Sequence, residues 1–168
     1  LFALALALQL LGTGLAPTGT LRATFIANNP VQGRVDAQTG AASGPAPDLA
    51  RELARRLGVA VEVTPLPSAG AVLESVRTGK ADIGFLAYEA ARAELVDYTD
   101  PYLLSGSAYA VRADSSIRRM AEVDRAGVTV GAVTGQSQAV WVGEHIRSAR
   151  IHAIPTVPPN AALAAMLL

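Results

Sequence analysis

The stretch from Gly79 to Tyr102 places a turn, a strand and a helix in close succession, in the order GKADIGFLAYEAARAELVDYTDPY. Its apolar run Ile83–Leu86 has the length of a strand and is bounded by turn residues. Residues Glu89–Val96 are rich in Ala, Glu and Arg and predict a helix, and Pro101 forces the residue before it out of the helical region. A strand that leads directly into a helix is typical of α/β folds, in which ligands bind at the carboxyl ends of the strands.

Arg92 lies in the first turn or so of this predicted helix, near the strand end. Its guanidinium is a planar fork of donors that suits a carboxylate, so it is a candidate ligand-binding group. The residues around it also allow a simpler interpretation, in which Arg92 is a solvated helix residue paired with Glu89.

This segment resembles the signature region of the family 3 extracellular solute-binding proteins, the periplasmic receptors of polar amino acid ABC transporters. The similarity rests on GKADIGF, on the Arg that follows, and on VDYTDPY. The spacing from Arg92 to Asp97 matches that from the family's carboxylate-binding Arg to the corresponding Asp. The resemblance implies a type II periplasmic binding protein-like α/β fold, with two lobes whose parallel-type sheets are flanked by helices. It favours ligand binding as the role of Arg92.

Composition excludes several other classes of protein. The 168 residues are 51% hydrophobic and 17% charged, enough for a sizeable core and too apolar for disorder. The formal net charge is zero, so there is no electrostatic case for a nucleic acid or an anionic membrane as partner. Without cysteine, disulfides, thiolate zinc sites and thiol catalysis are excluded. His145 and His152 lack metal-ligand spacing and are predicted to be surface or loop residues, and no cofactor is expected.

The first residues, Leu1–Leu11, form the apolar run LFALALALQLL, which is too short to span a bilayer. The run is typical of the central region of a secretory signal peptide, and a buried N-terminal helix is the alternative. Because the run has no polar face, we favour the signal peptide. We therefore expect residues 1–19 to lie outside the mature fold and the protein to be periplasmic.

The first half of the chain after this leader alternates between strand and helix patterns. Such a series predicts a parallel sheet with right-handed crossovers. The predicted elements are the strands Thr20–Ala27, Val59–Val63 and Ile83–Leu86 and the helices Pro45–Leu57 and Ser68–Thr78.

Local signals set the details of these helices. In the first helix, Leu49, Leu53 and Leu57 repeat every four residues and predict the face that packs on the sheet, and Gly58 is a natural stop. Ser68 is a plausible N-cap for the second helix. Residues 32–44, which begin with Gln32, form a polar loop.

In the second half, Leu103–Val111 predicts a strand, and the resemblance identifies it as the first crossing between lobes. A short helix through Met120 follows, capped by Ser115 or Ser116. The remaining predicted elements are the strands Val128–Val133 and Ile151–Ile154 and the helix Ala161–Leu168. The resemblance implies a first lobe at 20–106, a hinge strand at 107–112 and an incomplete second lobe at 113–168, with an apolar surface left bare.

Between strand and helix in this second lobe lies Thr134-Gly135-Gln136-Ser137. A glycine-containing turn that feeds a helix presents backbone N–H groups without intrahelical partners and the positive end of the helix dipole, which together suit an anion. The resemblance aligns Ser137 with a ligand-binding Thr of the family. The simpler interpretation is a Ser N-cap and nothing more. Trp141, one helical turn further on, is predicted to pack in the core.

Under the resemblance, Arg92 on one lobe and the Ser137 turn on the other grip the same carboxylate. Glu89 occupies the place of a Thr that bonds the ligand's amino group, and two interpretations stand: it pairs with a ligand cation, or it caps its own helix. Aromatic positions that sandwich a side chain in the family are absent, and Tyr88 is a candidate replacement for one of them. The predicted ligand-binding residues are Asn28, Ala87, Tyr88, Glu89, Arg92, Thr134, Gly135, Gln136 and Ser137.

The function implied by the resemblance is that of the substrate-binding component of an ABC uptake transporter. The expected partners are a small-molecule ligand (an amino acid or another carboxylate) and the transporter's membrane permease, and the protein is expected to be a monomer. Two alternatives stay open. One is a dehydratase-type enzyme on the same scaffold, with Glu89 as acid or base. The other is the ligand-sensing ectodomain of a signalling receptor.

Overall fold

A computed structural model describes residues 14–27 and 29–155. The chain forms two compact units, Leu1–Tyr98 and Thr99–Leu168. The predictions for Leu1–Leu11, Asn28 and Ala161–Leu168 lie outside the described residues. Among the described residues, no helix combines the length and the apolar character needed to cross a membrane.

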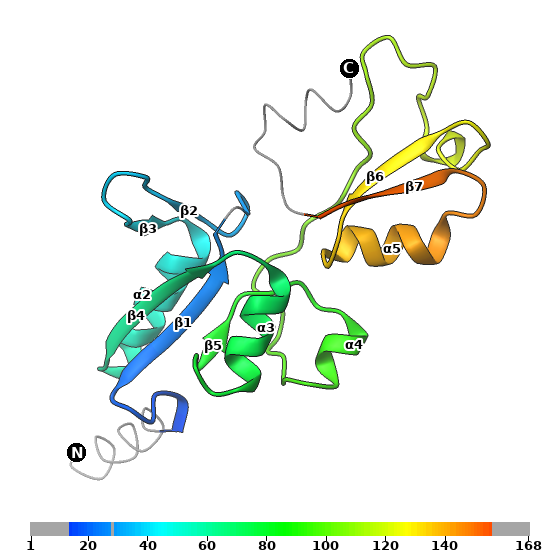
Figure 1. Ribbon diagram of the computed structural model, residues 1–168. Coiled ribbons are helices and arrows are strands. Elements are labelled where there is room, and N and C mark those ends of the chain that lie inside the picture. Colours follow the sequence, from blue (N-terminus) through cyan, green and yellow to red (C-terminus); the bar gives the residue numbers. More distant parts are fainter. Residues whose placement is uncertain (1–13, 28, 156–168) are drawn as a thin grey trace. The chain divides into compact units, whose positions relative to one another are not determined.

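The first unit contains a three-stranded parallel sheet with β1 (Thr20–Ile26) in the middle (Figure 1). β4 (Ala60–Leu66) pairs with β1 along its full length, and β5 (Ile83–Gly84) pairs with the opposite edge. The predicted series of alternating strands and helices around a parallel sheet is therefore confirmed. A small antiparallel hairpin, β2 (Arg34–Val35) with β3 (Ala42–Ser43), forms inside the predicted polar loop.

Helices α2 (Pro45–Leu57) and α3 (Ala69–Arg77) cover opposite faces of this sheet (Figure 1). Because successive side chains of a strand point to opposite faces, Leu21 clusters with Ala54 of α2, whereas Ile26 clusters with Val72 of α3. The local signals for the helix ends are confirmed. Ser68 caps α3 through its Oγ, which accepts from the N–H of Ala71 at 3.2 Å, and α2 stops at a left-handed glycine, Gly58.

Only part of the predicted leucine stripe of α2 packs on the sheet. Ala46, Ala50 and Ala54 are the buried members of a four-residue repeat, and Leu53 packs against the cluster of Leu21 and Ala54, whereas Leu49 is 42% exposed. Alanine side chains let the helix axis approach the sheet closely, so Leu49 lies beside the contact. A matching close approach occurs at Gly84, where an added Cβ would lie 2.7 Å from Val76 of α3.

β4 continues past the predicted Val63 and includes Pro65, which lies opposite Phe25 of β1. A proline is tolerated here because β4 is an edge strand of this sheet. In the parallel ladder the backbone nitrogen of Pro65 faces away from β1, since the Leu66 carbonyl on the next residue accepts from Ala27.

A charged pair fixes the start of β5 against β1. The backbone N–H of Arg22 and its Nε both donate to Asp82 Oδ2, at 2.8 and 3.1 Å, and Nη2 donates to Oδ1 at 2.5 Å. The Asp82 side chain is only 6% exposed. Burial raises the pKa of Asp82, but the hydrogen bonds and the positive charge of Arg22 outweigh it, so the net shift is downward.

The second unit contains a parallel pair, β6 (Thr129–Val133) with β7 (Arg150–Ile154), connected through helix α5 (Ser137–His145). Its apolar cluster consists of Val123, Val130, Val142 and Ile146. Asp124 accepts from the backbone N–H groups of residues 147, 148 and 149 and so ties the turn after α5 to the segment before β6. These backbone hydrogen bonds lower the pKa of Asp124.

Three predictions for this unit are wrong. Leu103–Val111 contains no strand, and Leu104 is 86% exposed. The short helix expected through Met120 is instead the 3₁₀ turn η1 (Met120–Glu122), while Ser115 Oγ accepts from the N–H of Ile117. Trp141 is 39% exposed and stacks on His145 at a ring distance of 4.2 Å. One helical turn separates these two rings on α5, so they meet on its surface and not in the core.

We expect the Arg22–Asp82 pair to make stability depend on pH. The folded pKa of Asp82 lies below its unfolded value, so its contribution is present above an unfolded pKa of about 3.9 and is lost as the pH falls through the folded pKa. Asp82→Asn should lower the free energy of unfolding by about 1–3 kcal/mol at pH 7, and the difference from wild type should shrink toward pH 2. Urea denaturation at several pH values measures both.

Asp48→Asn, at a pair with an exposed carboxylate, is the control and should change little. A difference from wild type that does not vary with pH would contradict the assignment.

Gly135 has a φ of 77°, a conformation that side chains with a Cβ rarely adopt, although a Cβ added there would meet no atom within 4 Å. Gly135→Ala should therefore destabilise the second unit by about 1–2 kcal/mol through backbone strain alone. Gly143→Ala is the matched control, because Gly143 lies inside α5 with open space around it, and alanine there should stabilise by about 0.5–1 kcal/mol. Thermal unfolding that shifts in the same direction for both variants would argue against this account.

Candidate functional site

The predicted ligand-binding residues of the first unit lie in the segment that follows β5. The strand ends at Gly84 and not at the predicted Leu86, and the predicted helix Glu89–Val96 is reduced to the single turn α4 (Ala90–Ala93). The segment leaves the sheet at the carboxyl end of its strands, the edge where ligands bind in open α/β sheets. Both predicted elements exist, therefore, but each is shorter than expected.

Arg92 is anchored to the backbone of this segment. Its Nη1 donates to the carbonyl oxygen of Ala87 at 3.0 Å, and the hydroxyl of Tyr98 donates to the same oxygen at 3.2 Å. A carbonyl oxygen has two lone pairs and accepts both. Because the guanidinium is rigid and planar, holding it from one side fixes the direction of the whole donor fork.

Two tyrosines surround this anchor. Tyr88 is 68% exposed and meets Tyr98 edge to face, with ring centres 5.3 Å apart and planes at 72°. Burial raises the pKa of the Tyr98 hydroxyl, against the opposing effect of the Arg92 charge. The hydroxyl is therefore protonated at neutral pH and serves as a donor to Ala87.

Glu89 stands at the N-cap position of α4, but its side chain makes no cap hydrogen bond. Its carbonyl oxygen instead accepts from the N–H groups of Arg92 and Ala93, at 2.9 and 3.0 Å. The interpretation of Glu89 as a helix cap is therefore wrong. Pairing with a ligand cation stays a prediction.

In the second unit, the predicted turn lies between β6 and α5. Thr134 donates its N–H to Ile154 and so continues the pairing of β6 with β7. Gln136 is the N-cap, without a side-chain cap bond, and Ser137 is the first residue of α5. The interpretation of Ser137 as the N-cap is thus wrong, while its role toward an anion, with that of Gly135, stays a prediction.

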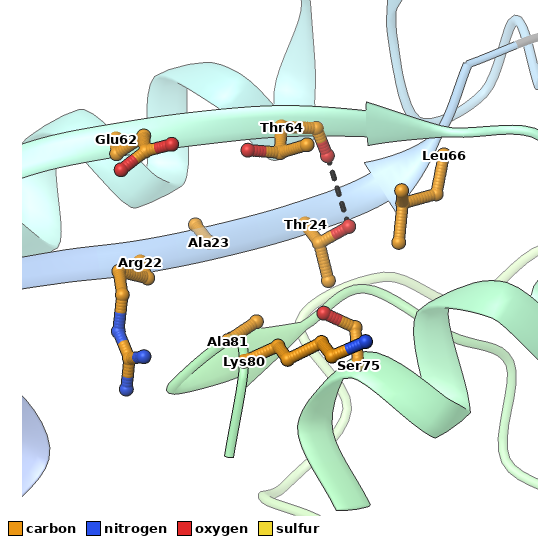
Figure 2. A pocket seen from close by; sticks show the side chains of 9 residues that line it. All are labelled: Arg22, Ala23, Thr24, Glu62, Thr64, Leu66, Ser75, Lys80 and Ala81. Carbon is orange, nitrogen blue, oxygen red and sulfur yellow. Dashed lines mark hydrogen bonds between the residues drawn. The ribbon is translucent and has the colours of Figure 1, made fainter. Parts of the chain in front are cut away.

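A cavity of about 250 Å³ lies elsewhere in the first unit, on the face of the sheet that α3 covers (Figure 2). None of the predicted site residues lines it. Two of its polar side chains are used by the fold: Thr24 donates to the Thr64 carbonyl at 2.9 Å, and Arg22 is held by Asp82. Among the described residues, no group of three or more His, Cys, Asp or Glu side chains could hold a metal ion.

The structure brings one further polar residue to the edge that carries Arg92. Gln32, which the sequence placed in a polar loop, is 6% exposed, and its side-chain amide lies between the ends of β1 and β5. The pattern around it, a glutamine between an Asn-Pro turn and a glycine, gave no signal of burial.

Comparisons with solved structures find binding proteins of similar fold. An ancestral amino acid-binding protein, described as a precursor of cyclohexadienyl dehydratase, is 26% identical with a TM-score of 0.77, over 92% of this chain and 68% of that one. An arginine-bound mutant of ArgBP from T. maritima is 25% identical with a TM-score of 0.70, over 85% and 67%. An ancestral arginine-binding protein bound to glutamine is 26% identical with a TM-score of 0.69, over 88% and 64%. The chain thus spans about two thirds of the length of each. No curated protein matches it.

These likenesses confirm the predicted type II periplasmic binding protein-like α/β fold. The family described as bacterial extracellular solute-binding proteins, family 3, matches residues 22–165, which is most of the chain. The chain therefore belongs to the family 3 bacterial extracellular solute-binding proteins.

Proposed function

We propose that this protein captures an amino acid or a similar small carboxylate for an ABC uptake transporter. Family membership supports binding as its activity, and the similar structures include an arginine-bound and a glutamine-bound protein. The observation that carries the proposal is the anchoring of Arg92 on Ala87 at the carboxyl end of the sheet. A fixed guanidinium at such an edge is suited to a carboxylate brought from solution.

In the proposed mechanism the ligand carboxylate docks on Arg92, and the turn Thr134–Ser137 of the second unit is proposed as a further anion-binding group. A charge-assisted hydrogen bond contributes about 1.5–3 kcal/mol, and a helix N-terminus adds about 0.3–2 kcal/mol. Tyr88 and Glu89 would then meet the rest of the ligand.

We place the protein in the periplasm, as a monomer that delivers its ligand to an ABC permease. Expression of the full-length gene with fractionation of the cells would locate it. Size-exclusion chromatography with light scattering would give its oligomeric state, and a dimer would revise that part of the proposal alone.

A dehydratase is the second candidate, because one similar structure is described as the precursor of cyclohexadienyl dehydratase. Glu89 would be its acid or base, since its side chain does not serve the helix as a cap. Incubating the full-length protein with cyclic hydroxy acids and following the products by mass spectrometry tests this candidate. Turnover that is lost in Glu89→Gln would favour the enzyme over the binding protein.

The ligand class is open to a direct screen. A bound ligand raises the unfolding temperature in proportion to RT ln(1 + [L]/Kd), so thermal unfolding with the twenty amino acids and a set of small carboxylic acids identifies binders. With a binder in hand, Arg92→Ala should weaken its affinity at least about tenfold with little loss of stability, because the carboxylate loses its charged partner. Isothermal titration calorimetry measures the affinity.

Arg77→Ala is the matched control for this experiment. Arg77 is another helical arginine of the first unit, engaged in an exposed pair with Glu74, and its removal should leave the affinity unchanged. Arg92→Lys should recover only part of the affinity, since an ammonium lacks the planar fork. Equal affinities for wild type and Arg92→Ala would remove Arg92 from the binding site.

A further inference from the structure

Gln32 uses every polar group it has to join four segments of the first unit. Its side-chain Oε1 accepts from the N–H of Ile26 at the end of β1, at 2.9 Å, and its Nε2 donates to the carbonyl of Phe85 after β5, at 3.0 Å. Its backbone carbonyl accepts from the N–H of Ala46 in the first turn of α2, at 2.8 Å. Its backbone N–H donates to the carbonyl oxygen of Asn29 and so holds the loop that contains Gln32.

The position of the side-chain amide follows from the ladder between β1 and β5. Thr24 lies opposite Gly84, and the N–H of Phe85 donates to Thr24. In a parallel ladder the next rung would run from the N–H of Ile26 directly to the carbonyl of Phe85. Those two groups are the ones that the Gln32 amide bonds. The amide therefore stands inside the ladder as an inserted rung.

We propose that Gln32 is a positioning residue for ligand binding. Its side-chain amide ends the pairing of β5 at Gly84 and turns the following segment away from β1. This inference rests on the proposed function of Arg92. The segment that Gln32 redirects begins at Phe85 and carries Ala87, whose carbonyl oxygen anchors both Arg92 and Tyr98. Without the inserted amide, Ile26 and Phe85 can pair directly, and Ala87 moves toward β1 with its anchored fork.

A purely structural role would make Gln32 one of several buried polar groups that add stability. Thr24 of β1 provides the comparison, because it is 1% exposed and its side chain donates to the backbone carbonyl of Thr64 in β4, on the side of β1 away from β5. Thr24→Val therefore removes a buried polar side-chain contact on the β4 side of the same sheet, while the backbone hydrogen bond from Phe85 to residue 24 is kept. It is the matched control for Gln32→Met, which keeps the length of the side chain and removes its hydrogen bonds.

The first measurement needs no ligand. Backbone amide NMR shifts of the full-length protein should change across residues 85–92 in Gln32→Met, whereas in Thr24→Val they should stay in place from residue 87 onward, past the residues that Thr24 contacts. Gln32→Leu likewise has neither an acceptor for Ile26 nor a donor for Phe85, so it should also move residues 85–92. This second variant preserves the test if Gln32→Met does not fold. Unchanged shifts across residues 85–92 in a folded Gln32 variant would overturn the inference.

The second measurement is the affinity for L-arginine and L-glutamine, determined by calorimetry for wild type, Gln32→Met, Arg92→Ala and the double variant. We expect Gln32→Met to weaken the bound probe at least about fivefold, Thr24→Val to leave it within about twofold, and the double variant to be no weaker than Arg92→Ala alone. Additive losses would mean that Gln32 does not act through Arg92 and would overturn the inference. Arg92→Ala that binds like wild type would count against the proposed function, and the NMR comparison would still decide whether Gln32 places the segment.

Discussion

The middle strand of the first unit must satisfy the hydrogen-bonding groups of both its edges, and the rest of that unit follows from how it does so. Along β4 the backbone ladder runs the full length of β1. Along β5 only two residues pair, and side chains supply what the ladder lacks. The Asp82 carboxylate accepts from the N–H of Arg22 at one end, and the Gln32 amide accepts from that of Ile26 at the other. Because buried N–H groups rarely go without a partner, these two side chains make a short third strand tolerable. The chain is thereby released from the sheet just before the segment that carries Arg92.

Much of the first unit could be predicted from short-range signals. Gly58 marks the end of α2 and Ser68 the start of α3, because glycine and cap residues act within a few positions of themselves. The alternation of strands and helices gave the parallel sheet. The packing face of α2 could not be read in the same way, because leucine and alanine repeats run side by side along it. Which repeat faces inward depends on how closely the sheet approaches the helix, and that distance is a property of the packed unit.

The extent of the site elements depends on contacts between residues far apart in sequence. Nothing within Ile83–Leu86 signals that pairing stops after Gly84, since the interruption comes from Gln32, which precedes it by about fifty positions. The sequence located Arg92 after a strand, but the carbonyl of Ala87 and the hydroxyl of Tyr98 that hold it became visible only in the structure. Leu103–Val111 failed as a strand for a related reason. An apolar run becomes a strand only when another strand pairs with it, and no such partner lies beside it among the described residues.

Pro65 gives the outer border of the sheet a property that matters before the protein is fully folded. A bare strand edge is a template on which a second polypeptide can add itself by backbone pairing, and self-association of half-folded chains starts at such templates. At Pro65 the outward-facing nitrogen carries no hydrogen, and Glu62 adds an exposed charge on the same strand. A chain that docks along this border finds the hydrogen-bond series broken near the carboxyl end of β4 and meets a carboxylate on the same strand. Pro65 and Glu62 thus disfavour the addition of a further strand at β4, and they oppose edge-to-edge pairing between copies of the protein at high concentration.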